Sequence, residues 1–178
     1  MNPRSLASRR RFLQTTALAA GATVFGSPAV LSAKSPNSKM NVACIAAGGR
    51  GGSHVGESKK MADLVELVAL CDVNSKALEH AAAQFPKART YRDFRELHAN
   101  MDDIDAVFIA TTEHTHAFAI LPVLRAKKHV YCEKPLTRDV FECRMVMEEA
   151  KKANVTTQMG TQIHSTPNYH RVVELLQS

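Results

Sequence analysis

The sequence alternates short apolar runs with segments of helical periodicity, and this alternation limits its fold more than any other feature. The apolar runs predict strands at residues 40–46, 64–71, 89–91, 106–110, 129–132 and 155–159. The periodic segments predict helices at residues 52–61, 75–85, 93–99, 116–126, 139–153 and 167–177. Apolar strands that alternate with helices are typical of a parallel sheet covered on both faces. We therefore expect a doubly wound α/β fold, Rossmann-like, with strand order 3-2-1-4-5-6.

Length and charge restrict the functional classes. The 178 residues allow one ordinary domain. The net charge of +6 is concentrated in residues 1–33, which hold four arginines and no acid. The remaining chain has 19 basic and 17 acidic residues, a net charge of +2. Nucleic-acid binding requires basic residues gathered on the folded part, so we do not expect nucleic acid as a partner.

The N-terminal segment resembles an export signal. Residues 8–14 read Ser-Arg-Arg-Arg-Phe-Leu-Gln, which is similar to the twin-arginine motif with Gln14 in place of lysine. The apolar stretch that follows is short and rich in small residues for a membrane span. We expect residues 1–33 to be a signal and 34–39 a linker, with twin-arginine translocation machinery as partner and a periplasmic or extracellular location. The alternative is a frayed cytoplasmic N-terminus.

The chain has four cysteines without C-x-x-C spacing. Cys44, Cys71 and Cys132 lie in predicted strands, and Cys143 lies in a predicted helix. An exported protein can form disulfides. Cysteines in buried strands are more often small hydrophobic residues, and we expect that role here.

A glycine-rich turn follows the first predicted strand. Its spacing is Ala46-x-Gly48-x-x-Gly51, a dinucleotide fingerprint with alanine at the first glycine position. Gly48 would let the backbone approach a pyrophosphate, and Gly51 would let the helix pack on the strand. The helix start would point amide groups at the anion, with Gly49 and Arg50 in the same turn. The alternative is a tight strand-to-helix turn that binds nothing.

Asp72 ends the second strand, 21 residues after Gly51. A carboxylate there accepts hydrogen bonds from the adenosine ribose and repels a 2′-phosphate, which favours NAD over NADP. The alternative is an acid at the start of the next helix.

The tripeptide Glu133-Lys134-Pro135 follows the fifth strand. Proline restricts the local backbone and helps to aim the lysine. The carboxyl ends of parallel strands line one edge of the sheet, where ligands bind in such folds. An ammonium group at the end of the fifth strand can stabilise a developing oxyanion there or exchange a proton with a substrate hydroxyl. The alternative is a lysine at a loop start with its tip in water.

Together these segments resemble the N-terminal half of the glucose–fructose oxidoreductase, inositol dehydrogenase and rhizopine catabolism (Gfo/Idh/MocA) family. The matching segments are residues 41–51, 69–72, 110–116 and 128–135. The resemblance covers residues 40–165 as a dinucleotide-binding domain, with residues 166–178 as the start of a substrate domain. Thr112 departs from the proline usual in the family.

The resemblance implies roles for individual residues. Thr111 and His116 would lie beside the dinucleotide, and Glu133 would contact the nicotinamide ribose region. Lys134 would be the catalytic lysine, and Gln162 would line the nicotinamide pocket. The family's second domain, with an aspartate and a histidine that work with the lysine, is expected to be missing from these residues.

His114 and His116 are spaced for metal binding, but no third ligand has suitable spacing, so we expect no metal site.

Three functions remain open. One is hydride transfer between NAD and a sugar or polyol, and another is redox-neutral glycoside cleavage. The third is a dinucleotide-binding fragment that is catalytically incomplete. An exposed apolar helix at residues 167–177 would favour association, including homo-oligomers.

Overall fold

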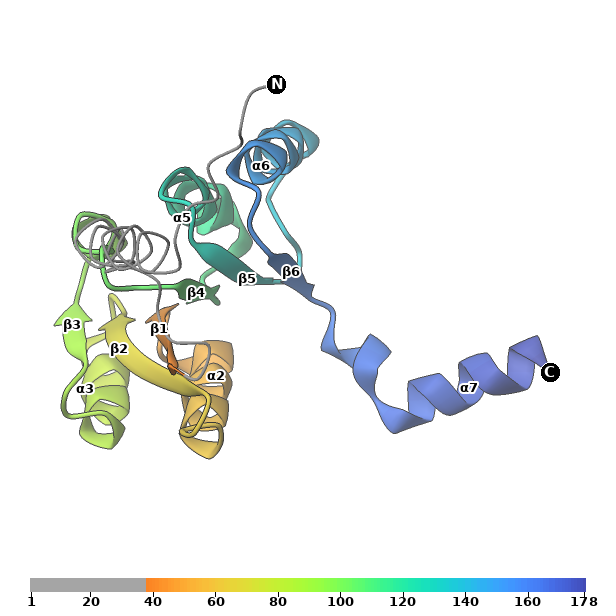
Figure 1. Cartoon of the computed structure of the whole chain (residues 1–178), viewed down its shortest axis with the longest axis horizontal. Helices are drawn as coiled ribbons and strands as arrows, with labels where there is room; N and C mark the ends of the chain where they lie inside the picture. The colour runs from red at the N-terminus through yellow and green to blue at the C-terminus, as the bar shows by residue number, and fades with distance from the viewer. Residues whose placement is uncertain (1–37) are drawn as a thin grey trace, which may run out of the picture. The chain divides into compact units, whose positions relative to one another are not determined.

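The strands form one parallel sheet in the computed structural model, which describes residues 38–178. Their order is β3-β2-β1-β4-β5-β6 (Figure 1), which confirms the expected Rossmann-like arrangement. The strands are β1 (Met40–Ile45), β2 (Val65–Cys71), β3 (Arg89–Tyr91), β4 (Ala106–Ile109), β5 (His129–Glu133) and β6 (Thr157–Gly160). Successive strands are added on one side of β1 up to β3 and on its other side from β4 onward, so the strand order switches between β1 and β4, where ligands bind in doubly wound folds.

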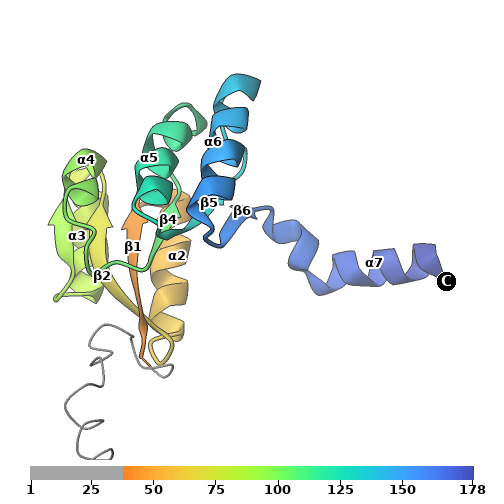
Figure 2. The same ribbon diagram turned by 45° about the horizontal axis from the view of Figure 1, so that its top comes forward.

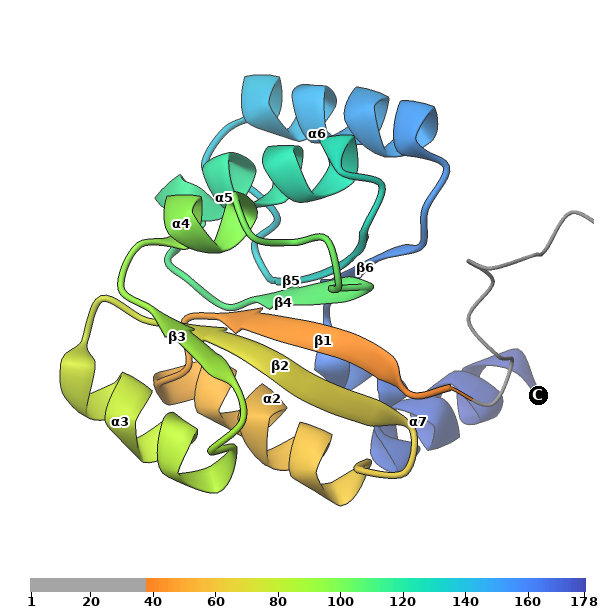
Figure 3. The same ribbon diagram turned by 60° about the vertical axis from the view of Figure 1, so that its left-hand side comes forward.

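Helices cover both faces of this sheet (Figure 2). One face carries α2 (Gly49–Lys60) and α3 (Ser75–Gln84). The opposite face carries α4 (Phe94–His98), α5 (Glu113–Arg125) and α6 (Val140–Ala153), as Figure 3 shows. This three-layer arrangement explains why the strands are apolar on both faces.

Alternate residues of β1 supply two separate cores. Ala43 and Ile45 belong to the cluster under α4, α5 and α6, whereas Val42 and Cys44 belong to the cluster under α2 and α3. Burial of a side chain such as Ile45 contributes roughly 1.5–3 kcal/mol. The period of two in strand side chains therefore anchors both helical layers to one strand.

The cysteines behave as expected from their burial. Cys44, Cys71, Cys132 and Cys143 are all free thiols. Burial is the main cause that raises the pKa of Cys44, Cys71 and Cys132 to about 12. These three thiols are therefore unreactive core residues near neutral pH.

Side-chain caps start three of the helices. Asn74 accepts a hydrogen bond from the Lys76 amide at the start of α3, and Asp139 accepts one from the Glu142 amide at the start of α6. Asp93 caps α4 in the same way. Asn and Asp are preferred N-cap residues because their side-chain oxygens accept hydrogen bonds from the free amides of the first helical turn.

Several helix boundaries differ from expectation. Helix α2 begins at Gly49 rather than at residue 52, and α5 begins at Glu113 rather than at residue 116. Helix α5 contains Pro122 and continues past it to Arg125. Burial of the flanking residues Ile120 and Val123 outweighs the hydrogen bond that proline cannot donate.

The β6 region also differs from expectation. Strand β6 begins at Thr157 rather than at residue 155, and a 3₁₀ turn, η1 (Gln162–Ser165), follows it without having been anticipated. The last helix, α7 (Pro167–Gln177), has the expected bounds and extends away from the sheet (Figure 1). Its residues are not buried, and Leu176 is 82% exposed. No helix in residues 38–178 is long and apolar enough to cross a membrane.

The expected signal, residues 1–33, and residues 34–37 of the expected linker lie outside the described residues.

Candidate functional site

Four candidate positions lie at or just beyond strand ends at one edge of the sheet. Ala46 follows β1, Asp72 follows β2, and Lys134 follows β5. Thr111 lies two residues beyond the end of β4. Because all strands are parallel, these positions gather at the carboxyl edge of the sheet.

The glycine turn is closely packed between β1 and α2. A Cβ atom on Gly51 would lie 1.6 Å from the Ala46 carbonyl oxygen, so no side chain fits there. Gly49 has a φ of 52°, in the left-handed region. Ala46 has a φ of 70°, which shows that the alanine at the first fingerprint position adopts the backbone conformation that favours glycine.

This turn leaves the start of α2 open to an anion. Gly48 is the N-cap, no side chain caps the helix, and its first turn has no acidic residue. Backbone amides at such a helix start carry partial positive charge and bind phosphate groups. The residues present therefore fit a dinucleotide pyrophosphate.

Asp72 joins β2 to the glycine turn. Its carboxylate accepts a hydrogen bond from the Gly48 amide at 2.9 Å and another from the Asn74 amide at 2.8 Å. Asp72 also lines a pocket of about 910 Å³, together with Ala46, Val73, Thr111 and Thr112. This volume lies within the usual range for a small-molecule site, roughly 300–1,000 Å³.

Thr111 contributes an unsatisfied polar atom beside that pocket. Its hydroxyl oxygen is buried and has no hydrogen-bond partner in residues 38–178. Most buried polar side-chain atoms have a partner. The orphaned hydroxyl is thus consistent with a site that is completed by a ligand.

His116 is a clamp between two loops. It is 1% exposed, and its two ring nitrogens lie 2.8 Å from the Pro135 carbonyl oxygen and 2.9 Å from the Thr111 carbonyl oxygen. It is not among the pocket-lining residues. His116 therefore joins the loop after β4 to the segment after β5.

Lys134 is exposed at the carboxyl edge. Within the part of the chain that the structure describes, its ammonium group has no hydrogen bond or ion pair. A cation without an internal partner is available to a substrate oxygen.

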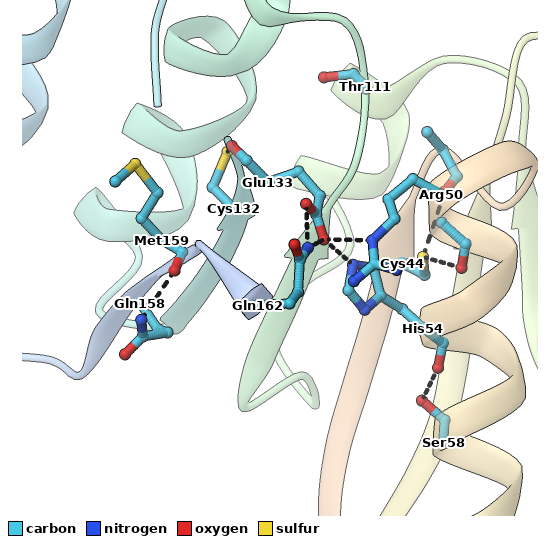
Figure 4. A network of polar contacts seen from close by, with 12 residues as sticks. Cys44, Arg50, His54, Ser58, Thr111, Cys132, Glu133, Gln158, Met159 and Gln162 are labelled. Carbon is cyan, nitrogen blue, oxygen red and sulfur yellow. Dashed lines mark hydrogen bonds and ion pairs between the residues drawn. The ribbon is translucent and has the colours of Figure 1, made fainter. Parts of the chain in front are cut away.

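Glu133, by contrast, is 5% exposed and fully engaged (Figure 4). Its carboxylate accepts hydrogen bonds from Arg50 Nε at 2.9 Å and His54 Nε2 at 2.8 Å. Gln162 Nε2 lies 2.7 and 2.6 Å from its two oxygens. Burial acts to raise the pKa of Glu133, but these hydrogen bonds outweigh it and lower the pKa.

The structure brings Arg50, Glu133 and Gln162 together, and adds His54, which the sequence analysis missed. His54 lies four residues after Arg50 on α2, so both side chains project from one side of the helix. This spacing was the available signal, but it does not reveal the partner on β5.

Within residues 38–178, no three histidine, cysteine or acidic side chains gather around a common point. His114 lines the pocket, whereas the ring of His116 is held by backbone carbonyl groups. The two histidines therefore have different surroundings.

Comparison with known proteins agrees with this geometry. Residues 40–161 match the model of the GFO_IDH_MocA oxidoreductase family, described as an NAD-binding Rossmann fold. A myo-inositol 2-dehydrogenase of Thermotoga maritima is 30% identical over 139 residues, covering 78% of this chain and 41% of that protein. An alpha-N-acetylgalactosaminidase of Shewanella oneidensis is 34% identical over 141 residues, covering 74% and 29%.

A solved structure supports the same conclusion. GenD2 from gentamicin A biosynthesis, solved in complex with NAD, is 26% identical and has a TM-score of 0.70. The match covers 82% of this chain and 41% of GenD2. The chain thus spans less than half the length of the relatives it matches. The matched residues include the glycine turn, Asp72 and Lys134, and the chain belongs to the Gfo/Idh/MocA oxidoreductase family, of which it carries the NAD-binding Rossmann domain.

Proposed function

We propose that this chain is the cofactor-binding part of an NAD-dependent oxidoreductase that acts on a carbinol carbon of a sugar or polyol. The observation that carries the proposal is Lys134, which has no hydrogen bond or ion pair within residues 38–178 and lies at the same sheet edge as a glycine turn that fits a pyrophosphate. The inositol dehydrogenase relative acts on a substrate of this chemical class by its name.

Different residues would bind the cofactor and take part in the reaction. The amides at the start of α2 would hold the pyrophosphate, and Asp72 would accept hydrogen bonds from the adenosine ribose. Bound NAD supplies the hydride acceptor or donor. Lys134 would hold the substrate oxygen and take up or return the hydroxyl proton.

The same arrangement favours NAD over NADP. A 2′-phosphate beside Asp72 would place two negative groups together. Arg50, the cation of the glycine turn, pairs with Glu133, so its charge is already partnered on the nicotinamide side of the turn.

A titration tests the proposal directly. Purified chain is titrated with NAD, NADH, NADP and NADPH by calorimetry, and NADH binding is followed in parallel by fluorescence. We expect NAD and NADH to bind at least about tenfold more tightly than their phosphorylated forms. An absence of NADH binding at millimolar ligand would overturn the proposed function.

A second function is favoured by one relative, the alpha-N-acetylgalactosaminidase at 34% identity. A glycosidase that uses NAD would release free sugar without net formation of NADH. Incubation with a polyol and with an aryl glycoside separates the two functions, because only the dehydrogenase accumulates NADH. Binding of NAD without either product would identify the third alternative, a binding domain that needs further residues for turnover.

We also propose that the protein is exported by the twin-arginine route, from the motif at residues 8–14. Folded export would let NAD load before translocation, so the exported protein should carry tightly held nucleotide. Replacing Arg9 and Arg10 with lysine should retain the protein in the cytoplasm, whereas replacing Arg4 should not. Equal export of both variants would contradict this route.

A further inference from the structure

The side chain of His54 is largely buried and lies against two aromatic rings of the sheet. Its side chain is 10% exposed, and its ring stacks on Phe108 of β4 with a centroid distance of 5.3 Å and an angle of 12°. The ring of Tyr131 on β5 makes a T-shaped contact with it, with a centroid distance of 5.1 Å and an angle of 69°. The one polar side chain that holds the ring in the described residues is Glu133, at 2.8 Å.

Gly160 closes this position from the β6 side. A Cβ atom at Gly160 would lie 2.9 Å from Glu133 Oε2 and 2.9 Å from the Tyr131 hydroxyl. Only a residue without a side chain, glycine, leaves room here for Glu133 and Tyr131 to occupy their positions. Glu133 is thus enclosed by packing as well as by hydrogen bonds.

The enclosed carboxylate connects three segments of the site (Figure 4). Arg50 and His54 approach it from α2, the helix whose start fits the pyrophosphate. Gln162 approaches it from η1. Lys134 follows it directly in the chain.

We propose that His54 is a positioning residue for the nicotinamide half of the dinucleotide, because its hydrogen bond to Glu133 sets the positions of Gln162 and Lys134 relative to α2. This inference rests on the proposed function. It assigns His54 no contact with the substrate or with the reacting atoms.

A neutral imidazole suits this role. Burial lowers the pKa of His54, although Glu133 acts in the opposite direction. Arg50 already supplies the positive charge that balances Glu133. A neutral ring can donate one hydrogen bond to Glu133 and keep its aromatic contacts without adding a second buried charge.

The competing interpretation is that His54 is only a packed core residue. In that case its replacement would weaken the fold and all nucleotide binding equally. A positioning role instead predicts a loss confined to ligands that contain the nicotinamide half. ADP contains only the adenosine and pyrophosphate half, so NADH and ADP separate the two interpretations.

The experiment uses the full chain with His54→Phe, which keeps an aromatic ring but removes the donor. NADH is titrated by fluorescence and ADP by calorimetry, and thermal unfolding reports the fold. We expect His54→Phe to weaken NADH about tenfold and ADP less than about twofold, since a hydrogen bond to a charged group is lost. His80→Phe, at an exposed position on α3, is the matched control and should change neither affinity.

His54→Gln is the rescue variant, since its amide can donate to Glu133. It should retain NADH affinity within about threefold of the unchanged chain. Unchanged NADH binding in His54→Phe, equal losses for NADH and ADP, or a Gln variant as weak as the Phe variant would each overturn the inference. Failure of the unchanged chain to bind NADH would instead overturn the proposed function itself.

Discussion

The two sides of the site are built in different ways. The adenosine side, formed by the glycine turn, Asp72 and Thr111, depends on backbone amides and a pocket beside β1, β2 and β4. The redox side depends on side chains from α2, β5 and η1 that meet at Glu133. Backbone geometry tolerates few substitutions at particular glycines, whereas a side-chain cluster can be altered one hydrogen bond at a time. Binding and redox geometry should therefore be separable by mutation.

Lys134→Ala should give the largest effect, and it should impair the redox side of the site while leaving the adenosine side intact. Turnover of a sugar or polyol should fall by roughly 10²–10⁴-fold, the usual contribution of a general acid or base. NAD affinity, measured by calorimetry, should stay within about threefold because Lys134 lies outside the turn that fits the pyrophosphate. Lys151→Ala, at an exposed position on α6, is the control. Equal losses of binding and turnover would show that the lysine acts in cofactor binding.

Gly51→Ala should damage the adenosine side through the backbone. The new Cβ atom would meet the Ala46 carbonyl at 1.6 Å, so β1 and α2 must separate. We expect a loss of about 3 kcal/mol in the free energy of unfolding, measured by urea denaturation. Gly56→Ala on the same helix meets nothing within 4 Å and should stabilise the fold by up to about 1 kcal/mol. Similar results for the two variants would refute the close contact.

Asp72→Ala should alter the adenosine side without changing the redox side. Loss of the carboxylate should weaken NAD by about tenfold and reduce the preference for NAD over NADP. The ratio of the two dissociation constants is the measurement. Asp63→Ala, exposed between α2 and β2, should leave that ratio unchanged. An unchanged ratio in Asp72→Ala would show that Asp72 only braces the turn through Gly48.

Ala46→Gly should relieve a strained position in the same turn. Ala46 has a φ of 70°, which disfavours a side chain, although glycine gains more freedom in the unfolded chain. The net gain in the free energy of unfolding should be about 0.5 kcal/mol. A destabilised variant would mean that contacts of the Ala46 methyl group outweigh the backbone strain.

The smallest effect concerns pH and the redox side. Burial lowers the pKa of His54 in the folded chain, so the unfolded chain binds more protons as the pH falls through the ordinary value of 6.5. Stability should therefore be full above that value and should decline below it. Glu133, whose folded pKa is also lowered, adds stability above its ordinary value of 4.5 that is lost in stronger acid. Urea denaturation from pH 8 to pH 5 should show a flatter profile for His54→Phe. The same slope in both proteins would place the titrating group elsewhere.

The sequence by itself determined the sheet order and the positions at its carboxyl edge. Right-handed crossovers and alternating strands and helices leave few topologies, so Ala46, Asp72, Thr111 and Lys134 could be placed at one edge from their positions after predicted strands.

The tertiary structure decided which side chains meet. Arg50, His54, Glu133 and Gln162 are far apart in the chain, and no local pattern specifies their contacts. The contacts of His116 with the carbonyl groups of Thr111 and Pro135 likewise join separate segments of the chain, and no local pattern predicts them. Local periodicity encodes elements, whereas packing between distant elements selects the partners of a polar side chain.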